Sequence, residues 1–205
     1  HLEVALNKLK TRYKVEVELK TPKVAYRETI RGKVIGEGRH KKQTGGHGQF
    51  GHVFVEFAPN PDEIEMVFEE KVFGGAIPKG YFPAVETGLR ECMEKGILAG
   101  YKVVNVKATL LDGKYHEVDS SEMAFKLAAH LAYKDAMPKA NPVLLEPIVD
   151  VQVKVPDEYT GDILGDFNKR RGAIMGMDMK DGYQMINAQI PLAEMQKYAI
   201  ELRAM

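Results

Sequence analysis

Residues 148–205 carry an order of predicted elements that few folds accommodate. The first predicted strand has alternating valines that share one inward face: Val149, Val151, Val153 and Val155. A helix over residues 158–171 ends at Gly172, two strands flank a turn at Asp181-Gly182, and a helix over residues 191–205 follows. This order gives five of the six elements of a ferredoxin-like split βαβ unit and lacks the final strand.

The expected core of this unit includes methionines and one face of the last helix. We expect four methionines to fill core rather than to bind a metal: Met175, Met177, Met179 and Met185. The last helix is expected to be amphipathic, with its apolar face on Leu192, Met195, Ala199 and Leu202. The absent final strand leaves an unpaired sheet edge.

Residues 22–147 form a second predicted unit, in which strands and helices are interspersed. The predicted strands lie at residues 24–36, 50–57, 63–72 and 101–110. In the third of these strands we expect Ile64, Met66 and Phe68 to be buried and the interleaved acids to be solvated. Pro142 and Pro147 mark the boundary to the next unit.

Two helices are predicted within this second unit. The first follows Pro83 and carries apolar residues at helical spacing: Val85, Leu89, Cys92 and Met93. The second spans residues 120–137 and carries Met123, Leu127 and Leu131 along one face. Asp119 and Glu122 resemble a capping box at its start.

Residues 1–21 supply one helix, with Leu2, Leu6 and Leu9 at helical spacing, and one strand over residues 13–19. These two elements are too few to bury a core alone. Both ends of the chain fall inside predicted helices, so we expect an excised piece of a larger protein. The whole pattern predicts an α+β fold.

Composition sets limits on the class of protein. The chain has 205 residues, 29 Lys+Arg against 29 Asp+Glu, and one cysteine, Cys92, which fits a reducing compartment. No apolar run approaches the roughly 20 residues that cross a bilayer, so we expect no integral membrane protein. The zero formal charge argues at first against a nucleic-acid partner.

The charge is nevertheless segregated along the sequence. Residues 31–52 hold five basic residues against one acid, Glu37, together with seven glycines and three histidines. A glycine-rich basic loop of this kind is suited to phosphates. We expect Gly45, Gly46, Gly48 and Gly51 to shape a long hairpin with bulges, whose tip carries Arg39, Lys41 and Lys42.

Two other interpretations of the same loop are weaker. Gly46, Gly48 and Gly51 match dinucleotide-binding spacing, but a strand follows where that fold needs a helix. The histidines at positions 40, 47 and 52 have no carboxylate or cysteine at zinc-ligand spacing. The alternative from a different functional class is an enzyme that binds a nucleotide through this loop.

A second loop, residues 112–121, contains His116, Asp119, Ser120 and Ser121, the residue types of a hydrolytic triad. It lacks a nucleophile elbow, and Asp119 and Ser120 are expected to cap the following helix. Elsewhere, Lys169, Arg170 and Arg171 end a helix, where cations suit the negative end of its dipole. We therefore predict no catalytic residue and no metal site.

Six long strings occur in order along the chain and closely resemble the bacterial elongation factor G family of translational GTPases. They are TPKVAYRETIRGKV, QTGGHGQFGHV, GGAIPKGYFPAVETGLRE, GILAGYKVVNVKATLLDGKYHEVDSSEMAFKLA, KANPVLLEPI and GDFNKRRGAIMGM. By this resemblance residues 1–21 end the family's third domain, residues 22–147 form the fourth with a ribosomal-protein-like fold, and residues 148–205 form most of the fifth. The GTPase domain is absent.

The resemblance implies a cytoplasmic factor that drives GTP-dependent translocation of tRNA and mRNA on the ribosome. The fourth domain would enter the small-subunit decoding centre and the fifth would contact large-subunit rRNA. No cofactor is expected in this piece, while GTP and Mg²⁺ belong to the missing domain. A ribosome-recycling or otherwise specialised paralogue is the alternative, because family members often carry Arg where His47 stands and Tyr where Phe50 stands.

The resemblance also assigns residues to RNA contact. His116 stands where eukaryotic relatives carry a modified histidine. Together with the basic hairpin, the expected tip contacts are Arg39, Lys41, Lys42, Gln43, Gly45, Gly46, His47, Gly48, Gln49, His116, Asp119 and Ser120. Possible rRNA contacts are Lys169, Arg170 and Arg171.

Overall fold

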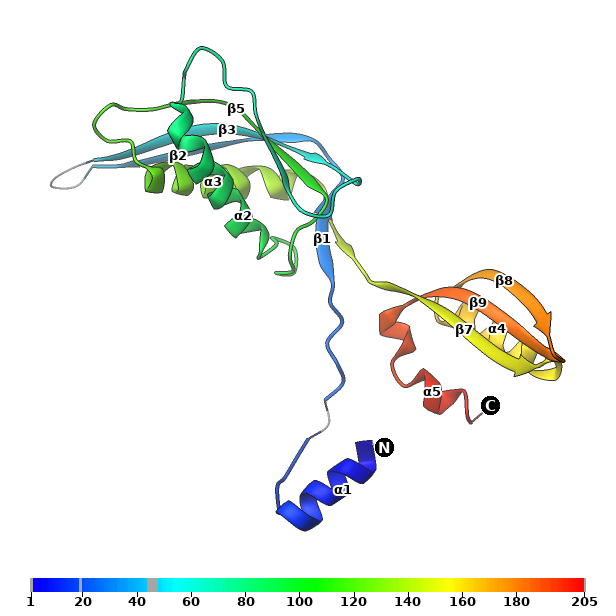
Figure 1. Ribbon diagram of the computed structural model, residues 1–205. Coiled ribbons are helices and arrows are strands. Elements are labelled where there is room, and N and C mark those ends of the chain that lie inside the picture. The colour runs from blue at the N-terminus through cyan, green and yellow to red at the C-terminus, as the bar shows by residue number, and fades with distance from the viewer. Residues whose placement is uncertain (1, 19, 44–47, 205) are drawn as a thin grey trace. The chain divides into compact units, whose positions relative to one another are not determined.

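The computed structural model describes residues 2–18, 20–43 and 48–204. It divides into two compact units, one formed by Tyr26–Glu146 and the other by His1–Ala25 with Pro147–Met205. Each unit mixes helices and strands and has its own buried core (Figure 1).

A four-stranded sheet organises the unit formed by Tyr26–Glu146. Its strands, in spatial order, are β2 (Val34–Lys42), β3 (Gln49–Pro59), β5 (Val106–Lys114) and β4 (Val67–Glu70). β2 pairs with β3 and β3 with β5 in antiparallel fashion, whereas β4 and β5 are parallel. A parallel pair requires a crossover, and the chain between β4 and β5 supplies it with η1 (Lys79–Tyr81) and α2 (Phe82–Met93).

Several strands of this unit differ in extent from those predicted, and one strand, β6 (Pro142–Leu145), was not predicted. The strand expected over residues 63–72 begins only at Val67, and Ile64 is 68% exposed rather than buried. Between the two prolines expected to mark a boundary lies β6, which pairs with β1 (Arg27–Ile30). Proline is tolerated there because it begins a strand of a two-stranded sheet.

Helices α2 and α3 (Glu122–Ala136) lie on the same face of this sheet (Figure 1), and η2 (Met137–Lys139) follows α3. The face of α3 that carries Met123, Leu127 and Leu131 is not its buried face. Met123 is 57% and Leu131 40% exposed. The buried face instead consists of Ala124, Phe125, Ala128, Ala129, Ala132, Tyr133 and Ala136.

The alanines of α3 are buried because glycines of the sheet lie directly beneath them. A Cβ built on Gly36 would come within 2.2 Å of the Ala132 carbonyl oxygen, and one on Gly38 within 1.8 Å of the Ala128 oxygen. Gly51 of β3 meets Ala124 in the same way, at 2.6 Å. We call these three contacts the glycine–alanine seam. Gly51, one of the glycines expected to shape the hairpin, therefore serves helix packing instead.

A buried carboxylate fixes the loop that leads from α2 to β5. Glu28 of β1 is 1% exposed, and its carboxylate accepts hydrogen bonds from the backbone N–H groups of Leu98, Ala99 and Tyr101 at 2.9, 2.8 and 3.0 Å. Gly96 must be glycine because a Cβ there would lie 2.1 Å from a Glu28 oxygen. The charged group is therefore accommodated by three donors rather than by solvent.

In the other unit β7 (Ile148–Pro156), β9 (Tyr183–Pro191) and β8 (Ala173–Lys180) form an antiparallel sheet in that order. The helices are η3 (Asp157–Tyr159), α4 (Thr160–Lys169), η4 (Leu192–Met195) and α5 (Tyr198–Glu201). The core gathers Ile163 and Phe167 of α4 against inward-facing residues of the sheet. The predicted turn at Asp181-Gly182 is present, with both residues at positive φ.

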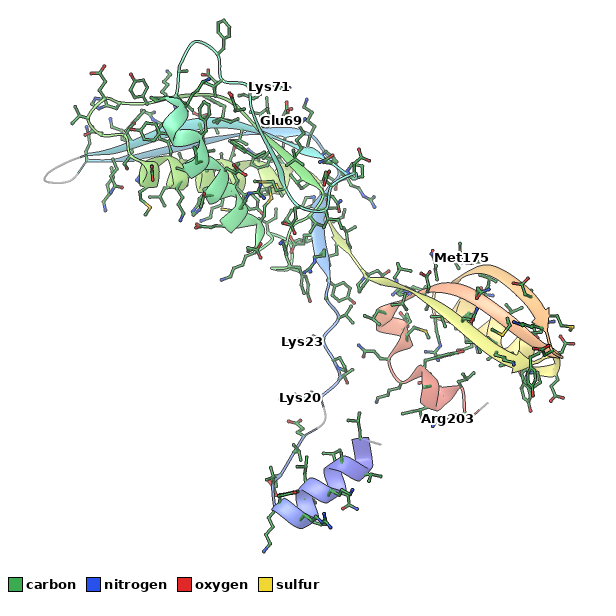
Figure 2. All side chains as sticks on the ribbon, in the orientation of Figure 1. Lys20, Lys23, Glu69, Lys71, Met175 and Arg203 are labelled. Atoms are coloured by element: carbon green, nitrogen blue, oxygen red, sulfur yellow. The ribbon has the colours of Figure 1, made fainter. Side chains whose placement is uncertain are left out.

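Two expectations for this unit are wrong. Met175, Met177 and Met179 are 62%, 49% and 64% exposed, because they lie on β8 at the sheet edge; Figure 2 labels Met175. The last helix is not continuous, since Lys197 at φ 67 separates η4 from α5. Consequently Tyr198, not Ala199, faces the core.

The first helix, α1 (Leu2–Tyr13), agrees with the predicted element, and Leu2 and Leu9 are 69% and 37% exposed. The strand expected over residues 13–19 is wrong over its described part. Residues 14–18 pair with no described strand, and an extended segment without a ladder partner is not a strand.

Candidate nucleic-acid interface

The hairpin arm formed by β2 and β3 carries the basic segment. The two strands pair in regular antiparallel register from Val34↔Phe57 to Lys42↔Gln49, so the expected bulges are absent from this pairing. Gly51 lies inside β3, so a strand follows the glycines, which excludes the dinucleotide-binding fold at this loop. The predicted contact residues Gly45, Gly46 and His47 lie outside the described residues.

The three cations of β2 do not share one face. Side chains alternate along a strand, so Arg39 and Lys41 lie on one face and Lys42 on the face of His40. All three cations are exposed, as is Gln43 just beyond the strand. The ion pairs along the described part of the arm join Lys33 to Glu56 and His52 to Glu37. Arg39, Lys41 and Lys42 take part in neither pair.

The described histidines of the arm are engaged in hydrogen bonds. His40 Nε2 lies 2.8 Å from Gln49 Oε1, and His52 Nε2 lies 2.7 Å from Glu37 Oε1. His52 is buried and its ring lies 4.9 Å from that of Phe54. Within the described ranges no group of three or more His, Cys, Asp or Glu could hold a metal ion.

The second loop, residues 115–121, is joined to the arm by backbone and side-chain bonds around Phe50. The Phe50 N–H donates to the Asp119 carbonyl at 2.8 Å, and the Ser120 hydroxyl donates to the Phe50 carbonyl at 2.8 Å. Gly48 lies against the Asp119 carboxylate, where a Cβ would come within 2.7 Å of its carbon. The arm and the loop therefore form one continuous surface, which we call the tip.

His116 sits on this surface with one nitrogen turned inward. Its Nδ1 accepts hydrogen bonds from the backbone N–H groups of Val118 and Asp119 at 3.3 and 3.2 Å, which assigns the ring proton to Nε2. The Asp119 carboxylate oxygen, 3.6 Å from Nδ1, is too far for a hydrogen bond. The side chain is 56% exposed, and its ring meets the Phe50 ring edge-on at 6.4 Å.

This geometry excludes the triad interpretation of the loop. The Ser120 hydroxyl accepts from the backbone N–H of His116 at 2.8 Å while it donates to Phe50, so the His116 ring does not activate it. Ser121, not Asp119 or Ser120, caps α3, because its hydroxyl accepts from the Ala124 N–H at 3.2 Å. The predicted capping role of Asp119 and Ser120 is therefore wrong, and both residues organise the tip.

The three basic residues at the end of α4, residues 169–171, differ in their bonding partners and exposure. The Arg170 side chain is 13% exposed and bonds Asp166, Glu201 and the Glu194 carbonyl, and the bond to Asp166 raises the pKa of Arg170. Arg170 is thus held by partners within its own unit, and its expected rRNA contact stays a prediction. Arg171 bonds Glu194 but stays 53% exposed, and Lys169 is exposed.

Two contributors to the tip were missed from sequence. Phe50 was noted only as a departure from the family, although its backbone is the junction between the two loops. Tyr81 stacks on Phe125 at 4.6 Å and donates to the Ser120 carbonyl at 3.4 Å. Neither role has a sequence signal, since both depend on contacts between distant segments.

No helix among the described residues is long and apolar enough to cross a membrane.

Comparison with known proteins assigns the family. Residues 22–141 match the model of elongation factor G, domain IV, and residues 143–205 match the model of the elongation factor G C-terminus. Elongation factor G of Aquifex pyrophilus is 52% identical over all 205 residues, which cover 29% of that protein. A crystal structure of a Thermus thermophilus protein shares 47% identity at a TM-score of 0.86, over 97% of this chain and 29% of the other.

The chain spans about 29% of the length of these relatives. Its two matched segments follow each other in sequence and together cover almost all of it. Domain IV alone accounts for more than half of the residues. The chain therefore belongs to the elongation factor G family.

Proposed function

We propose that this chain is the C-terminal part of a factor that promotes GTP-dependent translocation of tRNA and mRNA, and that its tip enters the small-subunit decoding centre. The observation that carries the proposal is the joining of two exposed loops into one surface through Phe50, Asp119 and Ser120. A rigid surface of this kind can hold a tRNA–mRNA duplex while the duplex moves.

The chemistry of the tip suits contact that does not depend on base sequence. Arg39 and Lys41 offer cations to phosphates, and the glycine-rich segment offers backbone N–H groups. With Nδ1 occupied, His116 presents an Nε2–H donor and a flat ring to sugar, phosphate or base. Such contacts fit a factor that must act on every codon.

The remaining assignments belong to the same proposal. Residues 1–21 end domain III, residues 22–147 form domain IV and residues 148–205 form most of domain V. The tip contacts are those named from the sequence, and the candidates for large-subunit rRNA contact are Lys169, Arg170 and Arg171, of which Lys169 and Arg171 are the more exposed. The parent would be a cytoplasmic GTPase whose GTP and Mg²⁺ bind outside this chain. A role in ribosome recycling is the alternative within the family.

The decisive experiment replaces His116 by Ala in the full-length parent. We expect slower translocation with nearly unchanged ribosome-stimulated GTP hydrolysis, because the tip acts on RNA and not on the nucleotide. Glu117→Ala, an exposed neighbour, is the matched control. Equal losses in both rates would refute the role of His116, and a loss confined to a parallel recycling assay would favour the recycling alternative.

The phosphate contacts are tested by salt dependence. Removal of Arg39 or of Lys41 should each reduce the magnitude of the slope of log binding constant against log salt, measured with ribosomes, by about 0.7–0.9. Lys95→Ala, an exposed cation elsewhere in the same unit, should leave the slope unchanged. A slope that responds equally to all three changes would contradict a localised basic contact.

A further inference from the structure

A second feature of the domain IV unit projects an aromatic side chain into solvent. The loop between β4 and η1 carries Phe73, which is 91% exposed, whereas the next most exposed large apolar residues of the described ranges reach 69%. Its neighbours behave differently, since Val72 packs against the core and Ile77 is 1% exposed. The apolar residues on both sides of the turn thus pack against the core, whereas the Phe73 ring is exposed to solvent.

The apex of this loop is a preorganised turn. Gly74 and Gly75 both have positive φ, at +66° and +71°, and the Ala76 N–H donates to the Phe73 carbonyl at 3.4 Å. Two successive positive φ values are the pattern of a type I′ turn, which glycine adopts without strain. Phe73 occupies the first position of the turn, so little further backbone ordering is needed when its ring meets a partner.

Both ends of the loop are fixed beside the tip. The Lys71 N–H donates to the Leu110 carbonyl at 2.8 Å, and Ile77 packs so closely on Gly113 that a Cβ there would lie 2.5 Å from it. Beyond the loop, Tyr81 donates to the carbonyl of Ser120, which belongs to the His116 loop. The Phe73 turn is therefore built on the same frame as the tip.

The charges around the turn favour an anionic partner. Between Lys71 and Lys79 the sequence contains no acid, and the exposed Glu70 lies just before Lys71, outside this stretch. Glu69, next to Lys71 in Figure 2, is already paired with Lys107 at 2.6 Å, and this bond lowers the pKa of Glu69. A lone exposed ring flanked by cations matches the way proteins stack unpaired bases. A stable protein interface would need a larger contiguous apolar area.

We propose that the Phe73 turn is an additional RNA-binding element, in which the ring stacks on an unpaired base while Lys71 and Lys79 contact neighbouring phosphates. This inference rests on the proposed ribosomal function and adds to it a contact that lies outside the two tip loops. Stacking tolerates any base, so the contact would add affinity without sequence preference.

The chain contains no tryptophan, so Phe73→Trp introduces a single fluorescent reporter. We would titrate this variant with purified small ribosomal subunits and measure binding in parallel by co-sedimentation. We expect binding to be retained and the Trp emission to be quenched by base stacking. Phe73→Ala and Phe73→Leu should weaken binding about 5- to 150-fold, because neither side chain stacks. Ile64→Ala, at an equally apolar exposed site, should have no effect.

Each alternative outcome is distinct. If Phe73→Leu binds as well as the native chain and the Trp emission shifts to the blue without quenching, the ring enters a protein pocket and RNA stacking is refuted. If Phe73→Ala binds normally while loss of Arg39 and Lys41 weakens binding, the turn has no role and the proposed function stands. If the native chain does not sediment with subunits at low salt, both proposals fail together.

Discussion

Replacement of Glu28 by Gln tests the strongest structural inference about the domain IV unit. The carboxylate is buried and accepts three backbone N–H groups, two at one oxygen and one at the other. Gln has nearly the same shape, but it has one acceptor oxygen and one NH₂ group. Whichever way the amide is turned, at least one N–H of the loop faces another donor.

The magnitude follows from these bonds. Hydrogen bonds to a charged acceptor contribute about 1.5–3 kcal/mol and neutral ones about 0.5–1.5 kcal/mol. If the amide oxygen faces Ala99 and Tyr101, two bonds weaken by about 1 kcal/mol each, and the Leu98 N–H loses its acceptor at a cost of about 1–3 kcal/mol. The expected loss is therefore about 3–5 kcal/mol, a large part of the roughly 5–15 kcal/mol that stabilises a typical domain.

The assay is urea unfolding combined with amide hydrogen exchange. With an m-value of about 1–3 kcal/mol/M, the midpoint of the domain IV transition should fall by roughly 1–5 M. The amides of Leu98, Ala99 and Tyr101 should lose protection first. Glu70→Gln, the same change at an exposed site, is the control and should stay within about 0.5 kcal/mol. A Glu28→Gln loss no larger than that of the control would refute the reasoning.

Three further changes test other parts of the structure. Gly38→Ala should destabilise the unit by at least about 1–3 kcal/mol in thermal unfolding, because the added Cβ would overlap the Ala128 carbonyl. The control Gly80→Ala has open space around the added Cβ and should be neutral or mildly stabilising. Ser121→Ala removes the cap of α3 and should cost about 1 kcal/mol by the same measurement; no change would show that the cap is dispensable. Burial raises the pKa of the Cys92 thiol to about 11, so its alkylation rate should keep rising with pH above 9, and a rate that levels off near pH 9 would contradict this. The same shift makes the contribution of Cys92 to the free energy of unfolding complete below pH 9 and progressively lost as the pH rises toward 11.

Periodicity predicted the elements whose burial follows a simple rule. In β7 the valines alternate, and in α2 Val85, Leu89 and Met93 are buried as expected. The α+β class followed from the order of these elements. The turn at Asp181-Gly182 followed from its residues alone, since both tolerate positive φ.

Elements that depend on distant partners could not be predicted in this way. In α3 the Leu and Met side chains at helical spacing share one face, but the small Ala residues of another face are buried, because Gly36 and Gly38 leave room only for them. The segment at residues 14–18 has strand-like alternation but no described ladder partner. The break at Lys197 has no glycine or proline to signal it.

The candidate site shows the same division. The basic glycine-rich segment and the His116 loop were identified from residue types and from resemblance to the family. Their connection was not, because it depends on the backbone of Phe50, whose two polar groups bond Asp119 and Ser120. Backbone groups are the same in every residue, so a junction made by them leaves no compositional trace.

The glycine–alanine seam has a mechanical consequence. Where long side chains separate a helix from a sheet, rotamer changes can absorb a displacement, but Gly and Ala have no such freedom. A force applied to the far end of β2 and β3 is therefore carried to α3 by direct backbone contact rather than dissipated in side-chain rearrangement. The arm can serve as a strut, which is the property required of a part that pushes against a load and must not bend.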